Sequence, residues 1–253
     1  MSVKRPLKLR PDLDAVVPET AMVMAAGLGK RMRPLTATRP KPLVEVAGRA
    51  LLDHALDRLR AAGVKRAVVN VHYLADALEA HLKRQAQDIE IIISDERNQL
   101  METGGGLVKA LPLLGDKPFV SVNSDNLWID GPIDSIKLLA RHWDDATMDA
   151  LLLMVPLARA NCHAGQGDFH LDAHGRITGR RRPGRLAPFV WTGVQILSPR
   201  LITDAPAGPF STNVFWDRAI AAGRAFGVVH QGLWFDVGTP GAVSAAEAIL
   251  ADA

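Results

Sequence analysis

The stretch from Ala25 to Leu43 combines glycines and cations in a pattern that suits the binding of a phosphate group. Gly27 and Gly29 follow an apolar run, residues 21–26, which predicts a buried strand, so the glycines stand at a strand end. Glycines let backbone N–H groups approach an anion closely. Four cations follow, Lys30, Arg31, Arg33 and Lys41, the last of them fixed between two prolines. The segment predicts a clamp for a polyphosphate; a solvated surface loop is the alternative.

Two common phosphate-binding loops do not fit this stretch. A dinucleotide fingerprint needs a third glycine where Met32 stands, and a Walker A loop needs Ser or Thr where Arg31 stands. The run AAGLGKRMRPLTATRPKPL instead resembles the signature of the sugar-phosphate nucleotidyltransferases, which join a nucleoside triphosphate to a sugar 1-phosphate. The resemblance extends to residues 70–74, 102–110, 120–126, 191–194 and 234–239. It implies these nucleotide-binding residues: Ala25, Ala26, Gly27, Gly29, Lys30, Arg31, Lys41, His72, Glu102, Thr103 and Gly104.

Two aspartates far apart in the chain, Asp125 and Asp236, each follow an apolar run. Each has an ordinary structural explanation, since Asp125 could cap a helix and Asp236 could cap the helix predicted over 241–251. Asp134 already suits the next helix, however, which leaves Asp125 available as a metal ligand. In the family that the chain resembles, aspartates at these positions bind magnesium beside the triphosphate. The resemblance therefore implies Mg²⁺ as the cofactor, with Asp125 and Asp236 as its ligands. Ser124 stands where that family usually has glycine.

The same resemblance implies which residues contact the base and the sugar. The turn Glu102-Thr103-Gly104 is predicted to lie beside the nucleobase, with glycines that leave room for a flat ring and Thr103 as the helix cap; a plain glycine-rich cap is the alternative. The sugar is assigned to Asn126, Trp191, Thr192 and Gly193, although Trp191 could equally belong to the core. Four arginines lie just upstream and could meet a sugar carboxylate or the 1-phosphate: Arg180, Arg181, Arg182 and Arg185. Asn213 and Trp216 are interpreted as structural.

The chemistry implied by this family needs charge neutralisation more than a general base. A phosphate monoester has a second pKa of about 6, so the attacking oxygen of a sugar 1-phosphate is already deprotonated at neutral pH. Arg31, Lys41 and Asp125 are the catalytic residues that the resemblance implies. Glu102 before Thr-Gly-Gly most resembles the bacterial branch that forms UDP-N-acetylmuramate from UTP and N-acetylmuramate 1-phosphate in cell-wall recycling. Mannose 1-phosphate guanylyltransferases share much of this layout, and a catalytically silent sugar-nucleotide sensor is a third hypothesis.

The amino-acid composition is typical of a globular enzyme and argues against nucleic acid and membranes as partners. The chain has 253 residues, 48% hydrophobic and 23% charged, with a formal net charge of +3 and one cysteine, Cys162. The basic residues form no continuous stripe, and no apolar run approaches the length of a membrane span or a signal peptide. We therefore expect a cytoplasmic protein, a monomer or small homo-oligomer, that binds UTP or another NTP and a sugar 1-phosphate but neither nucleic acid nor membranes. Cys162 forms no intrachain disulfide.

Apolar strands and amphipathic helices alternate after the clamp. Helices are predicted from Leu51 to Gly63, over 75–84 and from about 104, and strands over 67–71, 89–93 and 118–122. This order predicts an α/β fold that is Rossmann-like, with a mostly parallel sheet flanked by helices and a smaller sugar-binding lobe, as in glycosyltransferase-A-like proteins. We expect residues 1–20 to form an N-terminal extension and 21–253 the nucleotidyltransferase domain. Within it, 21–150 would bind nucleotide, 151–239 would bind sugar and 240–253 would form the C-terminal helix.

Overall fold

The computed structural model describes residues 15–85 and 88–251, so most of the predicted N-terminal extension lies outside the described residues. The main sheet contains β1 (Thr20–Met24), β4 (Arg66–Val71), β5 (Glu90–Asp95), β6 (Phe119–Asn123), β8 (Ala150–Pro156), β10 (Phe169–Leu171), β11 (Ile177–Arg180), β12 (Phe189–Leu197) and β13 (Ala225–Val229). The helices are α1 (Leu51–Ala62), α2 (Ala75–Gln85), α3 (Glu102–Leu114), α4 (Ser135–His142), α5 (Asn213–Ala221) and α6 (Pro240–Ala251).

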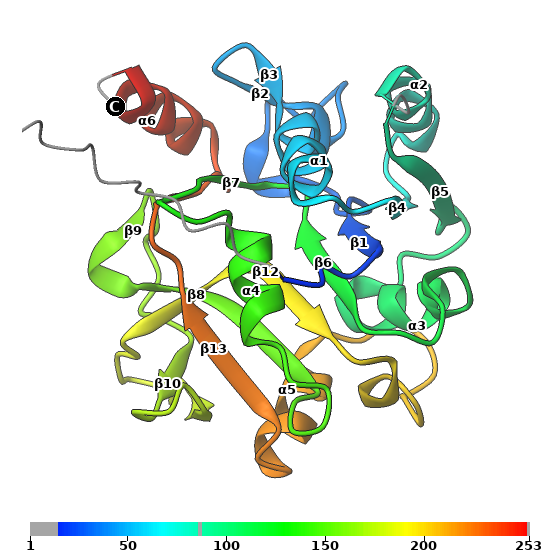
Figure 1. The fold of residues 1–253 in the computed structure, drawn as a ribbon. Coiled ribbons are helices and arrows are strands. Elements are labelled where there is room, and N and C mark those ends of the chain that lie inside the picture. Colours follow the sequence, from blue (N-terminus) through cyan, green and yellow to red (C-terminus); the bar gives the residue numbers. More distant parts are fainter. Residues whose placement is uncertain (1–14, 86–87, 252–253) are drawn as a thin grey trace, which may run out of the picture.

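The main sheet is parallel where the nucleotide-binding part was predicted and mixed beyond it. β6, β1, β4 and β5 are parallel neighbours, while β12 pairs antiparallel with both β6 and β8. β13 then pairs parallel with β8, and the β10–β11 hairpin extends the edge beyond β12. Figure 1 shows this sheet crossing the molecule with helices packed against it. The α/β architecture is confirmed.

Helices cover both faces of the sheet because the buried strands are apolar on both sides. One core cluster joins α1, α2 and α4 to the side chains of Val23, Val69 and Val122. The other joins α3 and α5 to Met22, Val68 and Phe119 on the opposite face. Gly63 adopts φ 97° and ends α1 as predicted, and the Asp134 side chain caps α4 by accepting from two backbone N–H groups.

A second, three-stranded sheet lies beside the first and was not predicted. It consists of β7 (Asn126–Ile129), β14 (Leu233–Asp236) and β9 (Ala160–Asn161), with β14 in the middle. A third core cluster joins this sheet to α6 and to the short hairpin of β2 (Glu45–Val46) and β3 (Arg49–Ala50). Figure 1 shows α6 next to that hairpin. Thus segments more than 100 residues apart meet at this corner.

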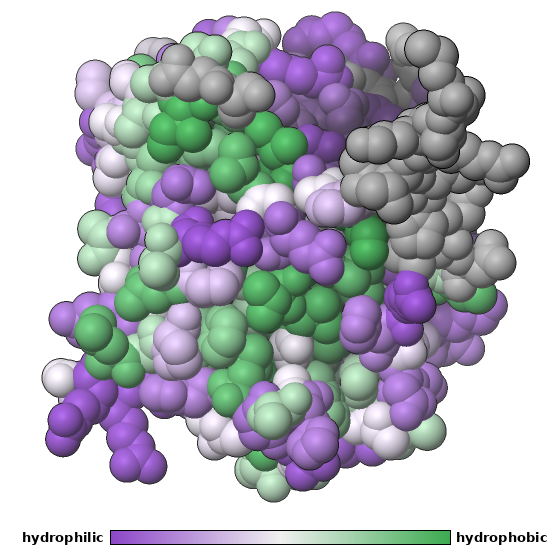
Figure 2. Space-filling model, turned by 60° about the vertical axis from the view of Figure 1, so that its left-hand side comes forward, coloured by the Kyte–Doolittle hydropathy of each residue, from purple (hydrophilic) through white to green (hydrophobic). Residues whose placement is uncertain are grey.

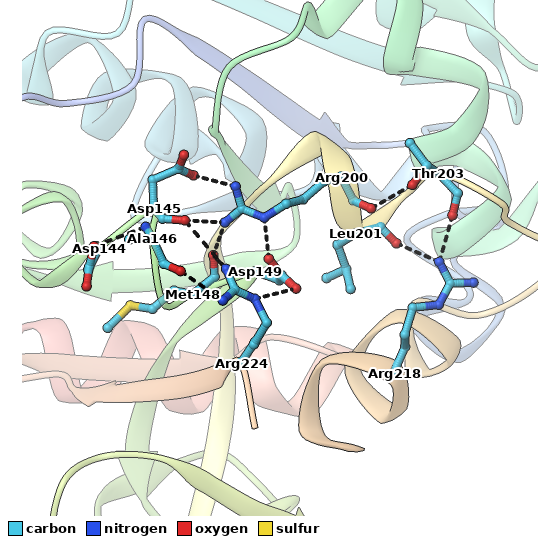
Figure 3. A network of polar contacts seen from close by, with 10 residues as sticks. All are labelled: Asp144, Asp145, Ala146, Met148, Asp149, Arg200, Leu201, Thr203, Arg218 and Arg224. Atoms are coloured by element: carbon cyan, nitrogen blue, oxygen red, sulfur yellow. Dashed lines mark hydrogen bonds and ion pairs between the residues drawn. The ribbon is translucent and has the colours of Figure 1, made fainter. Parts of the chain in front are cut away.

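Ion pairs connect residues that lie next to the ends of three strands of the main sheet: Asp149 before β8, Arg200 after β12 and Arg224 before β13. The Asp149 carboxylate accepts from Arg200 Nε at 2.5 Å and from Arg224 Nε at 2.9 Å (Figure 3). Both guanidinium groups also donate to carbonyl groups of the turn before β8, including that of Met148. Because Ala150 pairs with Leu197 at the end of β12, this network lies at the opposite end of that strand from Trp191.

The surface offers no extended apolar band on the face drawn in Figure 2, where hydrophobic areas alternate with hydrophilic side chains. Within residues 15–85 and 88–251, none of the helices has the length and apolar character that crossing a membrane requires.

Candidate active site

The clamp loop begins where β1 ends. β1 stops at Met24, two residues earlier than predicted, because the N–H of Ala25 turns to the Asn70 side chain, with N to Oδ1 at 2.6 Å. Gly29 has φ 60°, and its carbonyl accepts from Met32 N and from Thr36 Oγ1 at 2.8 Å. Within the described part of the chain, the N–H groups of residues 26–29 pair with no protein acceptor. The loop therefore presents free amides, as an anion-binding turn requires.

Lys41 is held rigidly against this loop. It lies in a single 3-10 turn, Lys41–Leu43, directly after Pro40, and is only 9% exposed. Its stem packs on Gly29, where an added Cβ would lie 3.1 Å from the Cβ of Lys41. Its ammonium group contacts Asp125, with Nζ to Oδ2 at 2.5 Å. Two residues that the sequence places 84 positions apart thus meet at the clamp.

The second sheet brings the two predicted metal ligands to the same place. Asp125 directly precedes β7, and in the antiparallel pairing of β14 with β7, Asp236 lies opposite Asn126. Arg31 lies nearby, since a Cβ added at Gly238 would be 3.5 Å from Arg31 Nη1 and 3.2 Å from Asp236 Oδ1. Asp236 does not cap α6, where Thr239 Oγ1 instead accepts from Ala242 N at 3.3 Å. The alternative that Asp236 serves only as a cap is therefore wrong.

The side chain of His163 is a partner of Asp236 that the sequence analysis missed. Its Nδ1 lies 2.9 Å from Asp236 Oδ2. This hydrogen bond lowers the pKa of Asp236, and the positive charges of Lys41 and Arg31 add to the effect although burial opposes it. The same bond raises the pKa of His163, again against burial. The two residues stand 73 positions apart with no motif between them, so no sequence signal could have found the pair.

Asp125 and Asp236 could form part of a metal site whose other ligands come from the substrate. Among residues 15–85 and 88–251, no group of three or more His, Cys, Asp or Glu side chains converges as a metal site. Mg²⁺ in phosphate-handling enzymes needs only one or two carboxylates, since waters and substrate phosphates supply its other oxygen ligands. Asp125 and Asp236 therefore fit Mg²⁺, and they leave the remaining ligands to the substrate.

A buried carboxylate positions the predicted nucleobase turn. Glu96 is completely buried and accepts from Asn70 Nδ2 at 2.8 Å and from Met101 N at 3.0 Å. His72 Nδ1 lies 2.8 Å from the carbonyl oxygen of Glu96. Asn70 thus connects this turn to the clamp, because its other amide atom binds Ala25. Glu96 follows directly after β5, so the rule that ligands bind at strand ends could have indicated it.

The turn itself differs from prediction in two respects. α3 begins at Glu102, which is exposed and has φ 61°, and Thr103 is not its cap: Thr103 Oγ1 accepts from Thr212 N at 2.9 Å. The space beside the glycines is also occupied by protein. A Cβ added at Gly104 would lie 2.4 Å from the Phe210 ring, and the Phe210 carbonyl accepts from Gly104 N. Close packing of this segment, rather than room for a flat ring, explains the glycine there.

The four predicted sugar residues lie on β7 and β12 but differ in exposure. Gly193 has φ 85° at a bulge in β12, and a Cβ there would lie 1.7 Å from Asn126 Nδ2, so these two residues are packed together. The Thr192 side chain is completely buried, and its hydroxyl donates to the Leu153 carbonyl at 2.9 Å. Trp191 is half-buried at the edge of a cavity. Ser124, the departure from the family pattern, is buried and donates to the Met24 carbonyl.

Known proteins resemble this chain in sequence and in fold. The N-acetylmuramate alpha-1-phosphate uridylyltransferase of Caulobacter vibrioides is 49% identical over 239 residues, covering 93% of this chain and 98% of that protein. The Neisseria meningitidis protein of the same name is 35% identical, covering 90% and 97%. The crystal structure of HddC from Yersinia pseudotuberculosis, complexed with GMP-PN, has the same fold: the TM-score is 0.75 at 23% identity, covering 92% of this chain and 99% of that one. The model of the nucleotidyl transferase family matches residues 20–177, and the chain belongs to that family.

Proposed function

We propose that this protein transfers the uridylyl group of UTP to N-acetylmuramate 1-phosphate, forming UDP-N-acetylmuramate and releasing pyrophosphate. The observation that carries the reaction type is the contact of Lys41 with Asp125 beside the free amides of the clamp, with Arg31 and Asp236 alongside. The choice of substrates is supported by the likeness to the Caulobacter relative over nearly the whole chain. We further propose that the enzyme acts in the cytoplasm, in cell-wall recycling.

The reaction joins two polyanions, and this site is built to offset that repulsion. A phosphate oxygen of the sugar 1-phosphate attacks the α-phosphorus of UTP, and the bond from the α-phosphorus to the oxygen that bridges it to the β-phosphorus breaks. The attacking oxygen carries no proton at neutral pH, so no residue needs to act as general base. Arg31 and Lys41 neutralise charge on the triphosphate and on the departing pyrophosphate. The free N–H groups of residues 26–29 add fixed dipoles at no reorganisation cost.

Mg²⁺ completes the proposed site. Asp125 and Asp236 would hold it, and when bound it would supply positive charge to the α-phosphate. Asp125 contacts Lys41 and Asp236 contacts His163, so protein contacts orient both carboxylates. Because these side chains are already oriented, they lose less conformational entropy when the substrates bind.

The uracil base is assigned to the turn that begins at Glu102. Glu102 has a left-handed backbone conformation, which is uncommon for a residue with a side chain and recurs at functional sites. The turn is fastened to the clamp through Glu96 and Asn70, so base and triphosphate would bind to one rigid unit. His72 lies on the same unit.

The direct test is release of pyrophosphate, measured for each of the four NTPs against a panel of sugar 1-phosphates that includes N-acetylmuramate 1-phosphate and mannose 1-phosphate. We expect turnover with UTP and N-acetylmuramate 1-phosphate, and dependence of that turnover on Mg²⁺. Turnover only with GTP and mannose 1-phosphate would refute the substrates but not the reaction type. Absence of turnover with every pair would favour a sugar-nucleotide sensor.

A further inference from the structure

A cavity of about 340 Å³ opens between α3, α5, β12 and the β10–β11 hairpin. One side is Thr103, from the proposed nucleobase turn, and another is Trp191, which is separated from Gly193 by a single residue. The lining also includes the side chains of Asp168, Phe169, Arg180, Arg181 and Trp216. A volume at the lower end of ligand pockets suits one sugar ring with its substituents. Asn213 and Trp216, interpreted from sequence as structural, also face this space.

Aromatic side chains form a rigid wall of the cavity. The rings of Trp191 and Trp216 meet edge to face with centroids 4.7 Å apart, and Phe169 meets Trp216 in the same way at 5.4 Å. Both indole N–H groups are satisfied inside the protein, that of Trp191 by the Val194 carbonyl and that of Trp216 by the Gln195 side chain. The carbon atoms of these aromatic rings could therefore pack against the apolar face of a pyranose ring.

Asp168 supplies a fixed carboxylate. Its Oδ2 accepts from Trp191 N at 3.0 Å, and its backbone bonds to both Phe189 and Arg181. Within the described residues, its Oδ1 has no donor. An ionised carboxylate oxygen in this position can accept a hydrogen bond from a hydroxyl or amide group of a ligand.

The two arginines of the cavity differ in how their charges are compensated. Arg180 forms an ion pair with Asp217, with Nη1 to Oδ2 at 3.1 Å. Arg181 has no carboxylate partner within the described part of the chain: its Nη1 lies 3.3–3.5 Å from the Gln166 amide oxygen and from the carbonyl oxygens of Arg182 and Arg185. Three long contacts to neutral acceptors leave the charge uncompensated. An arginine of this kind favours an anion that presents two oxygen atoms.

We propose that Arg181 binds a carboxylate carried by the sugar ring of the substrate, which makes this enzyme selective for an acidic sugar 1-phosphate. The inference rests on the proposed function, since N-acetylmuramate differs from N-acetylglucosamine by the lactyl group that bears such a carboxylate. Asp168 binds a hydroxyl or amide of the same sugar. Within the described residues no ion pair joins Asp168 to Arg181, so both charged groups can bind the ligand. A neutral sugar would leave the Arg181 charge unpaired in the filled pocket.

The test compares two substrates that differ in the lactyl group that bears the carboxylate. The enzyme is assayed with UTP and either N-acetylmuramate 1-phosphate or N-acetylglucosamine 1-phosphate, as wild type and as Arg181→Gln. We expect the substitution to lower kcat/KM for the acidic sugar by roughly 10- to 100-fold, the loss typical of a hydrogen bond between charged groups, mainly through KM. For the neutral sugar kcat/KM should stay within about 3-fold. Arg185→Gln serves as the matched control, because Arg185 lies in the same exposed segment between β11 and β12 but outside the cavity.

Two further measurements distinguish a failure of the Arg181 inference from a folding defect and from a failure of the proposed function. Arg181→Lys, which retains the charge without the two-pronged geometry, should restore part of the lost kcat/KM, whereas equal losses for both sugars in Arg181→Gln would overturn the inference. If the wild type instead rejects N-acetylmuramate 1-phosphate, the proposed function fails. The Arg181 inference is then tested by comparing kcat/KM for glucuronate 1-phosphate and glucose 1-phosphate. A preference for the acidic sugar that disappears in Arg181→Gln supports the inference, and any other result refutes it.

Discussion

Replacing Asp125 by Asn removes one negative charge from the proposed metal site with almost no change of shape. Lys41 Nζ contacts Asp125 Oδ2 at 2.5 Å, and an amide oxygen at that place still accepts this hydrogen bond. The carboxylate that we assign to Mg²⁺ is lost, however, and with it the charge stabilisation prearranged at the α-phosphate. Loss of one such group lowers turnover by roughly 10²- to 10³-fold in enzymes that depend on electrostatic stabilisation. We expect kcat of Asp125→Asn to fall by at least ~10²-fold.

The same substitution should cost little stability. The Lys41 side chain is 11% exposed and that of Asp125 is 34% exposed, so the ion pair is neither fully screened nor fully buried. Exposed pairs contribute up to about 1 kcal/mol, and removing one partner of a buried pair costs about 3–5 kcal/mol. Because the Asn side chain still accepts a hydrogen bond from Lys41, we expect the free energy of unfolding to fall by about 1 kcal/mol. For a chain of this size, that corresponds to a decrease in Tm of roughly 2–4 °C.

Pyrophosphate release with UTP and N-acetylmuramate 1-phosphate, measured over a range of Mg²⁺ concentrations, distinguishes the two effects. Thermal unfolding of the same preparation shows how much of the protein is folded at the assay temperature. Asp116→Asn is the matched control, since Asp116 is an exposed carboxylate on the turn before β6, at the opposite end of that strand from Asp125. A folded Asp125→Asn protein with nearly normal kcat at saturating Mg²⁺ would refute the assignment of Asp125 as a metal ligand.

Three further substitutions test the framework around the site. Gly193→Ala should lower the free energy of unfolding by at least ~2 kcal/mol in urea denaturation, because its φ is 85° and the new Cβ would overlap Asn126; an unchanged midpoint would contradict this packing. Asp149→Asn should destabilise the protein by about 1–3 kcal/mol, since it leaves both arginines of the network in Figure 3 without their shared carboxylate, and KM should stay the same because the network is remote from the site. His230 is completely buried, and burial lowers its pKa below the usual 6.5, so the unfolded chain binds a proton that the folded protein does not: stability should fall as pH falls below about 6.5. His230→Asn should make that decrease shallower, and identical pH profiles of the two proteins would show that other groups cause it.

Much of the parallel half could be predicted because its signals are local. The apolar face of α1, the glycine that ends it and the buried strand before each motif all lie within about a dozen residues of one another. The rule that ligands bind at the carboxyl ends of parallel strands then placed the clamp and Asp125 correctly relative to the sheet. Lys41 was assigned to phosphate from the family motif, and its contact with Asp125 follows from no local pattern.

The remaining features depend on pairings between distant segments. β9 has only two residues, and its partner β14 lies more than 70 positions away, so neither strand has a periodicity that would identify the other. The same holds for His163 beside Asp236 and for Thr103 beside Thr212, where one hydrogen bond replaces the helix cap that the sequence favoured. Helix capping is a local preference, and tertiary contacts can override it.

The second sheet shows that the predicted division near residue 150 is not a boundary between folding units. β12, from the predicted sugar-binding part, lies between β6 and β8 within the main sheet, and β14 pairs with β7 from the nucleotide-binding part. The register of that second pairing decides which face Asp236 occupies, because a shift by one residue would turn every side chain of β14 to the other side. Asp236 can approach Asp125 only if both parts have folded together. We therefore propose that the metal site of Asp125 and Asp236 forms only when both parts are present.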